Sequence, residues 1–257
     1  MPGAAALTLT ALHGVPTIEE GADLAAVIGA AAERSEVALR DGDVLVLAQK
    51  IVSKAEGRRV RLASVTPSPR ARELARTVDK DPRLVELILA ESEEVLRARP
   101  GVIIVVHRLG FVLANAGIDA SNVEAVDGEE SVLLLPADPD ASAERLRQGL
   151  RAATGAELGV VINDSFGRAW RLGTTGTAIG IAGLPGLVDL RGRPDRTGRA
   201  LRVTEIGAAD ELAAAASLLM GQADEGRPVI HVRGFPYAPR TGRAAELLRP
   251  KQLDLFR

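Results

Sequence analysis

Two short polar stretches carry the residues best suited to chemistry, and each directly follows an apolar run with strand character. The first is Asn115 to Asn122 and the second is Asn163 to Arg168. Short polar side chains at the end of a strand usually lie on a loop at the edge of a sheet, where ligands bind. We therefore predict that Asp119, in the first stretch, and Asp164, in the second, meet in space.

The side chains of these stretches favour a metal site with oxygen ligands. The chain has no cysteine, and its three histidines are isolated, so we predict structural roles for His13, His107 and His231. Carboxylate, hydroxyl and amide oxygens suit hard cations such as Mg²⁺ or Mn²⁺ better than zinc. For either aspartate alone, the alternative is a carboxylate that only binds the backbone of its own turn.

Cations near these stretches point to phosphate chemistry. Arg168 and Arg171 follow Asp164, and Lys50 and Lys54 follow a buried-strand pattern at 44–48. Such groups can neutralise phosphate oxygens, so the combination predicts phosphoryl or nucleotide chemistry. The segment Gln49 to Gly57 is either a phosphate-binding loop or helix start, or a solvated connection, and its spacing leaves both open. The phosphate-loop and dinucleotide-binding motifs are absent, which argues against a Rossmann dehydrogenase.

Composition limits the class of protein. A 257-residue chain that is 46% hydrophobic can bury a sizeable core, and its 2% aromatic content means that aliphatic residues must build that core. The net charge of -2 argues against a protein held on nucleic acid by bulk charge. The sequence shows neither a signal-peptide pattern nor a run long enough to span a bilayer. We expect a soluble cytoplasmic protein.

Strand and helix patterns are interleaved along the chain. Strands are predicted at 6–12, 44–48, 102–106, 111–114, 131–136, 159–162, 174–181 and 229–233, and helices at 18–34, 69–78, 82–96, 141–153, 208–220 and 244–248. Residues 58–68 are predicted as a loop and 191–202 as an exposed basic loop. Glu91, Glu93 and Glu94 are predicted to form the solvent-exposed face of the helix at 82–96. A hairpin over 102–114 favours a mixed α/β fold rather than a plain doubly wound sheet.

Five segments together resemble one known family. They are Asp41–Val46, Ile51–Gly57, Asn115–Asn122, Asp164–Arg168 and Leu218–Gly221. In this order they resemble the coenzyme F420-0:L-glutamate ligase family, and the similarity runs from about Val15 to Arg233. The resemblance implies a GTP-dependent amide ligase that adds L-glutamate to the lactyl-phospho side chain of the deazaflavin coenzyme through an acyl phosphate, and then adds further γ-linked glutamate. GDP and phosphate are the implied by-products.

The resemblance also implies the architecture. It predicts a mixed-sheet α/β fold particular to the family, in an intertwined homodimer with GTP near the subunit interface. We expect one ligase unit over residues 1–257, which could contain two subdomains, in the stand-alone form without the flavin-binding reductase domain that some bacterial relatives carry. The implied partners are F420-0 and L-glutamate, with no nucleic acid and no membrane.

Site residues follow from the resemblance position by position. It implies metal ligands at Asp119, Asp164, Ser165 and Gln222, for Mg or Mn, and it allows for potassium as well. It implies GTP contacts from Val15, Pro16, Thr17, Ile18, Gln49, Lys50, Lys54, Asn122, Met220, Gly221, Gln222, Ala223, Asp224, Glu225, Gly226 and Arg227. Lys54 is the candidate for stabilising charge on the transferred phosphoryl group. Archaeal members of the family have Glu where this chain has Gln222.

Two alternatives to this function stay open. One is a metal-dependent amide ligase that acts on a different carboxylate acceptor, and the other is a GTP-binding protein without turnover. The sequence leaves open the number of glutamates added and the residues that bind the deazaflavin. The basic loop at 191–202 either meets a coenzyme phosphate or a glutamate carboxylate, or is a solvated surface.

Overall fold

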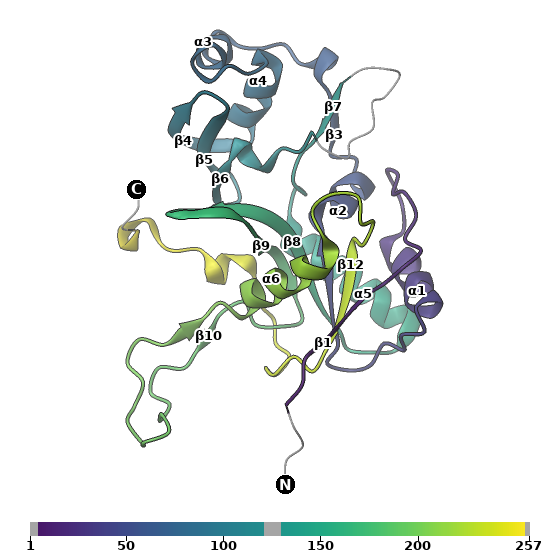
Figure 1. Ribbon diagram of the computed structural model, residues 1–257. Helices are drawn as coiled ribbons and strands as arrows, with labels where there is room; N and C mark the ends of the chain where they lie inside the picture. Colours follow the sequence, from purple (N-terminus) through teal and green to yellow (C-terminus); the bar gives the residue numbers. More distant parts are fainter. Residues whose placement is uncertain (1–4, 121–129, 255–257) are drawn as a thin grey trace.

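A five-stranded sheet forms the centre of the larger part of the protein (Figure 1). The computed structural model describes residues 5–120 and 130–254. The strand order is β1 (Thr8–Ala11), β12 (Val229–Arg233), β2 (Val44–Ala48), β8 (Gly159–Arg168) and β9 (Arg171–Ala182). β2 and β8 are parallel and the other neighbours are antiparallel. The near-continuous apolar runs of β2 and β12 are buried because both faces of the sheet are covered.

Helices cover the two faces of this sheet. α6 (Ala208–Met220) packs on one face, while α5 (Pro139–Thr154) and its neighbour α1 (Leu24–Arg34) lie on the other (Figure 1). Two glycines of β9 allow the close approach: a side chain at Gly176 would overlap the backbone of Ala213 in α6, and one at Gly180 would overlap the backbone of Pro139 in α5. The β8–β9 register is irregular between these two glycines. This irregularity changes which face of the sheet the later residues of β9 point to, so Gly176 and Gly180 lie on opposite faces.

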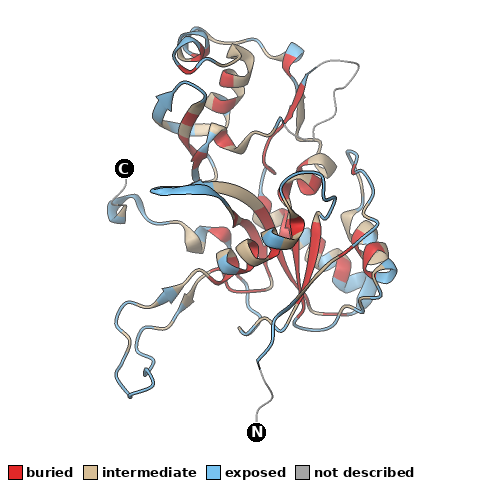
Figure 2. Cartoon of the chain, viewed as in Figure 1, coloured by how far each residue is buried: buried red, intermediate tan, exposed pale blue. Residues whose placement is uncertain are grey.

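A smaller unit has a hydrophobic core of its own. It comprises α3 (Pro69–Val78), α4 (Pro82–Ala90) and the sheet β4 (Ser92–Arg99), β5 (Val102–His107) and β6 (Val112–Ala114). Its core is made of Ala71, Ala75, Val78, Val85, Ile88, Ile103, Val105 and Ala116. Figure 2 shows buried residues gathered separately in this unit and in the central sheet. The protein therefore has two separate hydrophobic cores.

Short elements join these parts and extend from them. α2 (Gln49–Ala55) follows β2, and β3 (Arg59–Arg61) pairs with β7 (Ser131–Leu133). Three-ten helices lie at η1 (Leu62–Ser64), η2 (Asn115–Gly117), η3 (Ala244–Leu247) and η4 (Lys251–Leu253). An arm formed by β10 (Val188–Asp189) and β11 (Glu205–Ile206) projects from the body (Figure 1). None of the helices in the described ranges has the length and apolarity needed to cross a bilayer.

Several predicted elements are confirmed. The helices at 69–78 and 208–220 and the strands at 44–48 and 229–233 have the predicted bounds. The hairpin over 102–114 is confirmed by the antiparallel pairing of β5 and β6. The 191–202 loop is exposed throughout nearly all of its length, as predicted. Mixed α/β architecture is therefore shown.

The predicted helix at 82–96 is wrong in its second half. α4 ends at Ala90, and Ser92–Arg99 instead pairs with β5, with Gly101 in a left-handed turn between the strands. Local apolar spacing does not reveal this pairing, because the partner strand lies later in the chain. Glu91 consequently lies against Arg58, His107 and Arg108 rather than on a wet face, whereas Glu93 and Glu94 are exposed.

Other boundaries also differ from the predictions. The helix predicted from residue 18 begins at Leu24, because the Asp23 carboxylate accepts hydrogen bonds from the backbone of Ala25 and Ala26 and caps it. The predicted loop at 58–68 contains β3 and η1, and the strand predicted at 131–136 ends at Leu133. The division into subdomains and the homodimer stay predictions.

Candidate functional site

Asp164 lies within a strand and not on the predicted loop. β8 continues past Ile162 to Arg168, and Asp164 pairs with Thr177 of β9. The prediction of a strand end at this point is therefore wrong. The physical reason is the long partner strand, which supplies backbone hydrogen bonds to polar residues that have no preference for strand structure of their own.

The chain reaches Asp119 through an unusual turn. Asn115, Ala116 and Gly117 have positive φ angles of 51°, 54° and 65°. The Asn115 side chain accepts a hydrogen bond from the backbone N–H of Ile103 at 3.1 Å, which ties this turn to β5. Asp119 then exchanges two backbone hydrogen bonds with Leu133, at 3.0 and 2.8 Å. Its backbone is thereby fixed, and its side chain is directed by its other contacts.

The fold brings the two aspartates together. The pKa of Asp164 is raised to about 7, first by burial and then by the charge of Asp119, while the Ser165 N–H and the charge of Lys50 oppose the rise. Burial also raises the pKa of Asp119, with Lys50 and Gln49 opposing the shift. Two carboxylates that are close and poorly solvated are costly to ionise together. A cation between them would relieve that cost.

The start of α2 supplies two partners for Asp119. Ala48 lies in register with Asn163 across the parallel β2–β8 pair, so the first turn of α2 lies beside Asp164. Lys50 Nζ is 3.2 Å from Asp119 Oδ2. The buried Gln49 donates from Nε2 to the same oxygen at 2.6 Å. The segment forms a helix with buried residues, so the solvated connection is wrong, while phosphate binding by this helix start stays a prediction.

A third residue of α2 fixes the orientation of the Gln49 amide. Ser53 Oγ donates to Gln49 Oε1 at 2.8 Å, and both side chains are buried. With its oxygen occupied by Ser53, Gln49 presents its NH₂ group to Asp119. Sequence reasoning missed this chain of hydrogen bonds and the Lys50–Asp119 ion pair. The sequence feature that could have predicted these contacts is the position of Gln49 and Lys50 directly after a buried strand.

Two of the predicted metal ligands touch each other. Ser165 Oγ donates to Gln222 Oε1 at 2.8 Å, although the residues come from β8 and from the loop after α6. That loop folds on itself, since the Ala223 N–H donates to Glu225 Oε2 at 2.9 Å and the Glu225 carboxylate fills the space beside Gly221. Gly221 has a φ of 75°. This backbone conformation favours glycine at the position.

The predicted nucleotide segment before α1 lies against the other end of α2. The Gly21 N–H donates to the carbonyl of Ala55 at 2.8 Å, and Ile18 is buried while Pro16 and Thr17 are exposed. Lys54 is half-buried, and no carboxylate in the described ranges pairs with it. Asn122, another predicted nucleotide contact, falls outside the described residues.

The donor set fits a hard divalent cation. Within 5–120 and 130–254, no three His, Cys, Asp or Glu side chains gather as a metal cluster. The predicted set, however, needs only the carboxylates of Asp119 and Asp164, completed by the hydroxyl of Ser165 and the amide oxygen of Gln222. All of these ligands are oxygens, which Mg²⁺ and Mn²⁺ prefer. The raised pKa of Asp164 is the observation that favours a cation here.

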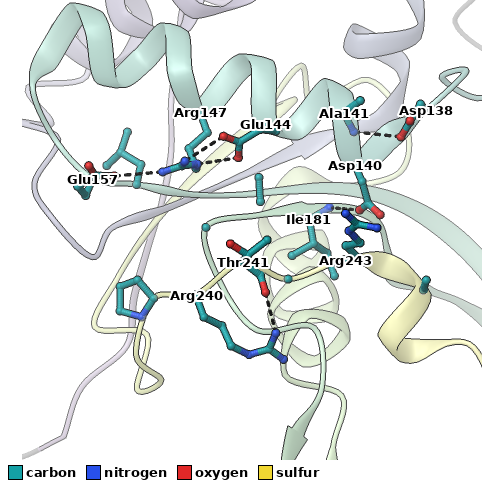
Figure 3. Close-up of a pocket in the computed structure, with 16 residues that line it drawn as sticks. Asp138, Asp140, Ala141, Glu144, Arg147, Glu157, Ile181, Arg240, Thr241 and Arg243 are labelled. Carbon is teal, nitrogen blue, oxygen red and sulfur yellow. Dashed lines mark hydrogen bonds and ion pairs between the residues drawn. The ribbon is translucent and has the colours of Figure 1, made fainter.

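A separate cavity lies toward the other end of β8 (Figure 3). It has a volume of about 680 Å³ and lies between α5, the end of β9 and residues 239–245. Arg147 in this cavity pairs with Glu144 and Glu157, at 2.8 and 3.1 Å. Arg240 pairs with Glu246 at 2.6 Å. Because Arg147 and Arg240 are already paired with carboxylates, the aspartate cluster is the better candidate for anion and metal chemistry.

Comparison with known proteins assigns the chain to a family. Residues 14–234 match the family described as F420-0:Gamma-glutamyl ligase. The chain belongs to this family. Each aspartate and lysine of the site lies within the matched residues, so the site belongs to the part of the chain that defines a family of ligases.

Curated relatives of this ligase family cover nearly the whole chain. A protein of Methanothermobacter thermautotrophicus is 47% identical over 98% of this chain and 99% of its own length. One from Methanopyrus kandleri is 46% identical over 93% of both chains. One from Archaeoglobus fulgidus is 46% identical over 96% of this chain and 94% of its own. All three carry the name coenzyme F420:L-glutamate ligase.

Proposed function

We propose that this family member joins L-glutamate to coenzyme F420-0 at the expense of GTP, and then adds further γ-linked glutamate. Family membership supports the ligase class. The observation that carries the proposal is the close pair of Asp119 and Asp164 beside Lys50, because phosphoryl transfer needs a metal-binding carboxylate pair and cations near the phosphates. We assign F420-0 and L-glutamate as its substrates.

The chemistry is a phosphoryl transfer followed by an acyl transfer. A terminal carboxylate oxygen of F420-0 attacks the γ-phosphorus of GTP, so that an acyl phosphate forms and GDP leaves. The amine of L-glutamate then attacks the acyl carbon, loses a proton and displaces inorganic phosphate, which leaves the amide. Each added glutamate therefore consumes one GTP. Both steps build negative charge on phosphate oxygens, so the site must provide positive charge.

The side chains of the site divide this task. Asp119, Asp164, Ser165 and Gln222 would hold Mg²⁺ or Mn²⁺, with potassium as a further ion, and bound metal would neutralise phosphate charge. Lys54 has no carboxylate partner in the described ranges, so its ammonium group is available to a phosphate oxygen. Lys50 is 31% exposed and can turn from Asp119 toward a bound phosphate once Asp119 binds metal. Gln49 keeps Asp119 in place throughout.

Two loops provide the proposed nucleotide contacts. Residues 15–18 lie against α2 through the adjoining Gly21–Ala55 hydrogen bond, and residues 220–227 reach β8 through Gln222. Together with Gln49, Lys50 and Lys54 of α2, they surround the aspartate pair. Asn122 is included on the family resemblance alone. We propose that the GTP phosphates lie at the aspartates and the base among the loops.

We also propose a homodimer. Large apolar side chains are exposed at the tip of the β8–β9 hairpin, where Trp170 is 87% and Leu172 is 97% exposed. Val203 in the arm and Leu218 on α6 are 83% and 88% exposed. Side chains of this kind on projecting elements are typical of an interface. Sedimentation of the Leu172→Glu variant tests the proposal: dissociation is expected, and a monomeric wild-type protein would contradict it.

The activity is tested in one reaction. Purified protein is incubated with GTP, Mg²⁺ or Mn²⁺, L-glutamate and F420-0, and the deazaflavin product is analysed by mass spectrometry. We expect a product heavier by one or more glutamyl units, with one GDP formed per amide. Bound GTP that persists without GDP would indicate a GTP-binding protein without turnover. Product with another acceptor, and none with F420-0, would indicate a ligase of different specificity.

A further inference from the structure

A cavity of about 800 Å³ lies where three separate parts of the chain converge. Its walls are the β4–β5–β6 sheet, the β8–β9 hairpin near Arg168, and the C-terminal segment around Arg249. Figure 1 shows the hairpin between that sheet and the C-terminal segment. None of the proposed metal ligands or GTP contacts in the described ranges lines this cavity, so its role needs a separate explanation.

One wall of the cavity is an uncovered apolar face of a sheet. Neighbouring residues of a strand point to opposite faces. In β5, Ile103 and Val105 pack into the core of the smaller unit, whereas Ile104 lines the cavity. In β6, Val112 also lines it and is 41% exposed, while Ala114 pairs with Ile104. A sheet face of this kind suits a flat, largely apolar ligand.

The rest of the cavity wall carries positive charge that is not neutralised. Arg97, Arg168 and Arg249 line it, and within the described ranges none of them pairs with a carboxylate. The side chains of Arg97 and Arg168 donate hydrogen bonds to the carbonyls of Leu96 and Leu172, at 2.7 and 3.2 Å. This differs from the cavity of Figure 3, where Arg147 and Arg240 are paired with glutamates.

Two acids also line the cavity, but they leave an excess of positive charge. Glu94 pairs with Lys251 at 3.1 Å, and Asp254 lies in the C-terminal segment. The cavity wall also contains four cations, Lys251 and the three arginines. Guanidinium groups bind phosphate oxygens with paired, charge-assisted hydrogen bonds. The cavity thus combines an apolar wall with a site for a phosphate anion.

Strand β8 links this cavity to the candidate active site, because it contributes residues to both. Arg168 follows Ser165 on the same strand by three residues. An extended strand rises roughly 3.3 Å per residue, so the two positions are about 10 Å apart. Arg168 and Asp164 are four residues apart and lie on the same face of β8, so a ligand with its flat ring in the cavity and its phosphate at Arg168 would direct a side chain beyond that phosphate toward Asp164.

On the basis of the function proposed above, we infer that this cavity binds the acceptor coenzyme. The deazaflavin ring lies against Ile104 and Val112, and the phosphate of its side chain lies among Arg97, Arg168 and Arg249. The lactyl carboxylate then points along β8 toward the aspartate pair. One ligand with an apolar ring, an anionic phosphate and a terminal carboxylate accounts for the apolar wall, the arginines without a carboxylate partner and the position of Arg168 on the same strand as Asp164.

Equilibrium dialysis of full-length protein tests this assignment without turnover. The probes are F420-0 and the deazaflavin riboside that lacks the phospholactyl group, both without GTP, metal or glutamate. For Arg97→Gln and for Arg168→Gln, we expect F420-0 affinity to fall by about tenfold, the effect of losing one charge-assisted hydrogen bond, while riboside affinity is unchanged. Val112→Glu should weaken both probes. The matched control is Arg193→Gln, in the exposed arm, which should change neither.

The outcomes separate this inference from the proposed function. If wild-type protein forms glutamyl product but all three cavity variants bind F420-0 normally, the cavity assignment is wrong and the function stands. If wild-type protein neither binds nor converts F420-0, both are wrong. If Val112→Glu turns a dimer into monomers without changing F420-0 affinity, a second copy of the chain covers the cavity, which also overturns the assignment. Circular dichroism confirms that each variant is folded.

Discussion

The Lys50 ammonium group lies 3.2 Å from the Asp119 carboxylate and also lowers the pKa of Asp164, so one cation serves both acids of the site. Lys50 only partly compensates them, because the pKa values of both aspartates are still raised. The ligand-free site therefore has a deficit of positive charge that a divalent cation can fill. In the proposed function, Lys50 would then contact the nucleotide.

The aspartate pair is expected to be essential for turnover. Asp119→Asn and Asp164→Asn each remove one negative charge from the proposed metal site, and we expect at least a hundredfold loss of GDP release that depends on F420-0 and glutamate, of the order seen when one group that stabilises transition-state charge is removed. The matched control is Asp79→Asn. Asp79 is exposed with a φ of 53°, a conformation that Asn adopts equally well. Near-normal turnover in either site variant would contradict the metal assignment.

Gln49 is expected to stabilise the folded protein as well as to orient Asp119. Gln49→Leu leaves the buried Ser53 hydroxyl and the Asp119 carboxylate without their amide partner. We expect the free energy of unfolding to fall by about 1–3 kcal/mol, the usual cost of an unsatisfied buried polar group. Urea denaturation measures this change. Gln148→Leu, which removes an exposed bond to Glu144, should change it by less than about 0.5 kcal/mol.

Gln222 offers a gain-of-affinity test. Gln222→Glu would add a third carboxylate beside Ser165 while keeping an oxygen to accept the Ser165 hydroxyl bond. We expect Mn²⁺ to bind about tenfold more tightly, because carboxylate count raises the affinity of oxygen sites for divalent cations. Calorimetric titration of nucleotide-free protein measures this. Gln252→Glu adds the same charge at an exposed C-terminal position and should have no effect. Unchanged affinity in Gln222→Glu would exclude Gln222 as a ligand.

Glu91 makes stability depend on pH. Burial alone would raise the pKa of Glu91, but the nearby His107 ring, the hydrogen bond from Arg108 and the charges of Arg58 and Arg108 outweigh it and lower the pKa to about 2. Since the ordinary value is 4.5, the stabilisation is complete above pH 4.5 and is lost as pH falls toward 2. The shift corresponds to about 3 kcal/mol at neutral pH.

A comparison of variants at two pH values tests this contribution. Glu91→Gln should lower the free energy of unfolding by about 3 kcal/mol at pH 7 and by clearly less at pH 3, where Glu91 of the unfolded chain is protonated. Glu93→Gln is the control, because Glu93 is an exposed neighbour on β4. An equal loss in Glu91→Gln at both pH values would show that packing, and not ionisation, accounts for the effect.

Part of the fold follows from local patterns. The helix at 69–78 has Ser68 as its cap and a proline in its first turn, and the buried strands at 44–48 and 229–233 are continuous apolar runs. Signals of this kind are read within a few residues, so the elements have the predicted bounds. The 82–96 helix is wrong because β4 depends on pairing with β5, a contact outside the local pattern.

The sequence by itself determined the residue types of the site and the family, because short motifs such as Ser53 to Gly57 and Asn115 to Asn122 are continuous in the chain. Only the tertiary structure decided how those residues meet. The parallel register of Ala48 with Asn163 brings α2 beside Asp164, and the hydrogen bonds of Gln49 orient Asp119. Distances and burial depend on packing between distant segments, so the raised pKa values, and the unpaired arginines of the second cavity, appear only after folding.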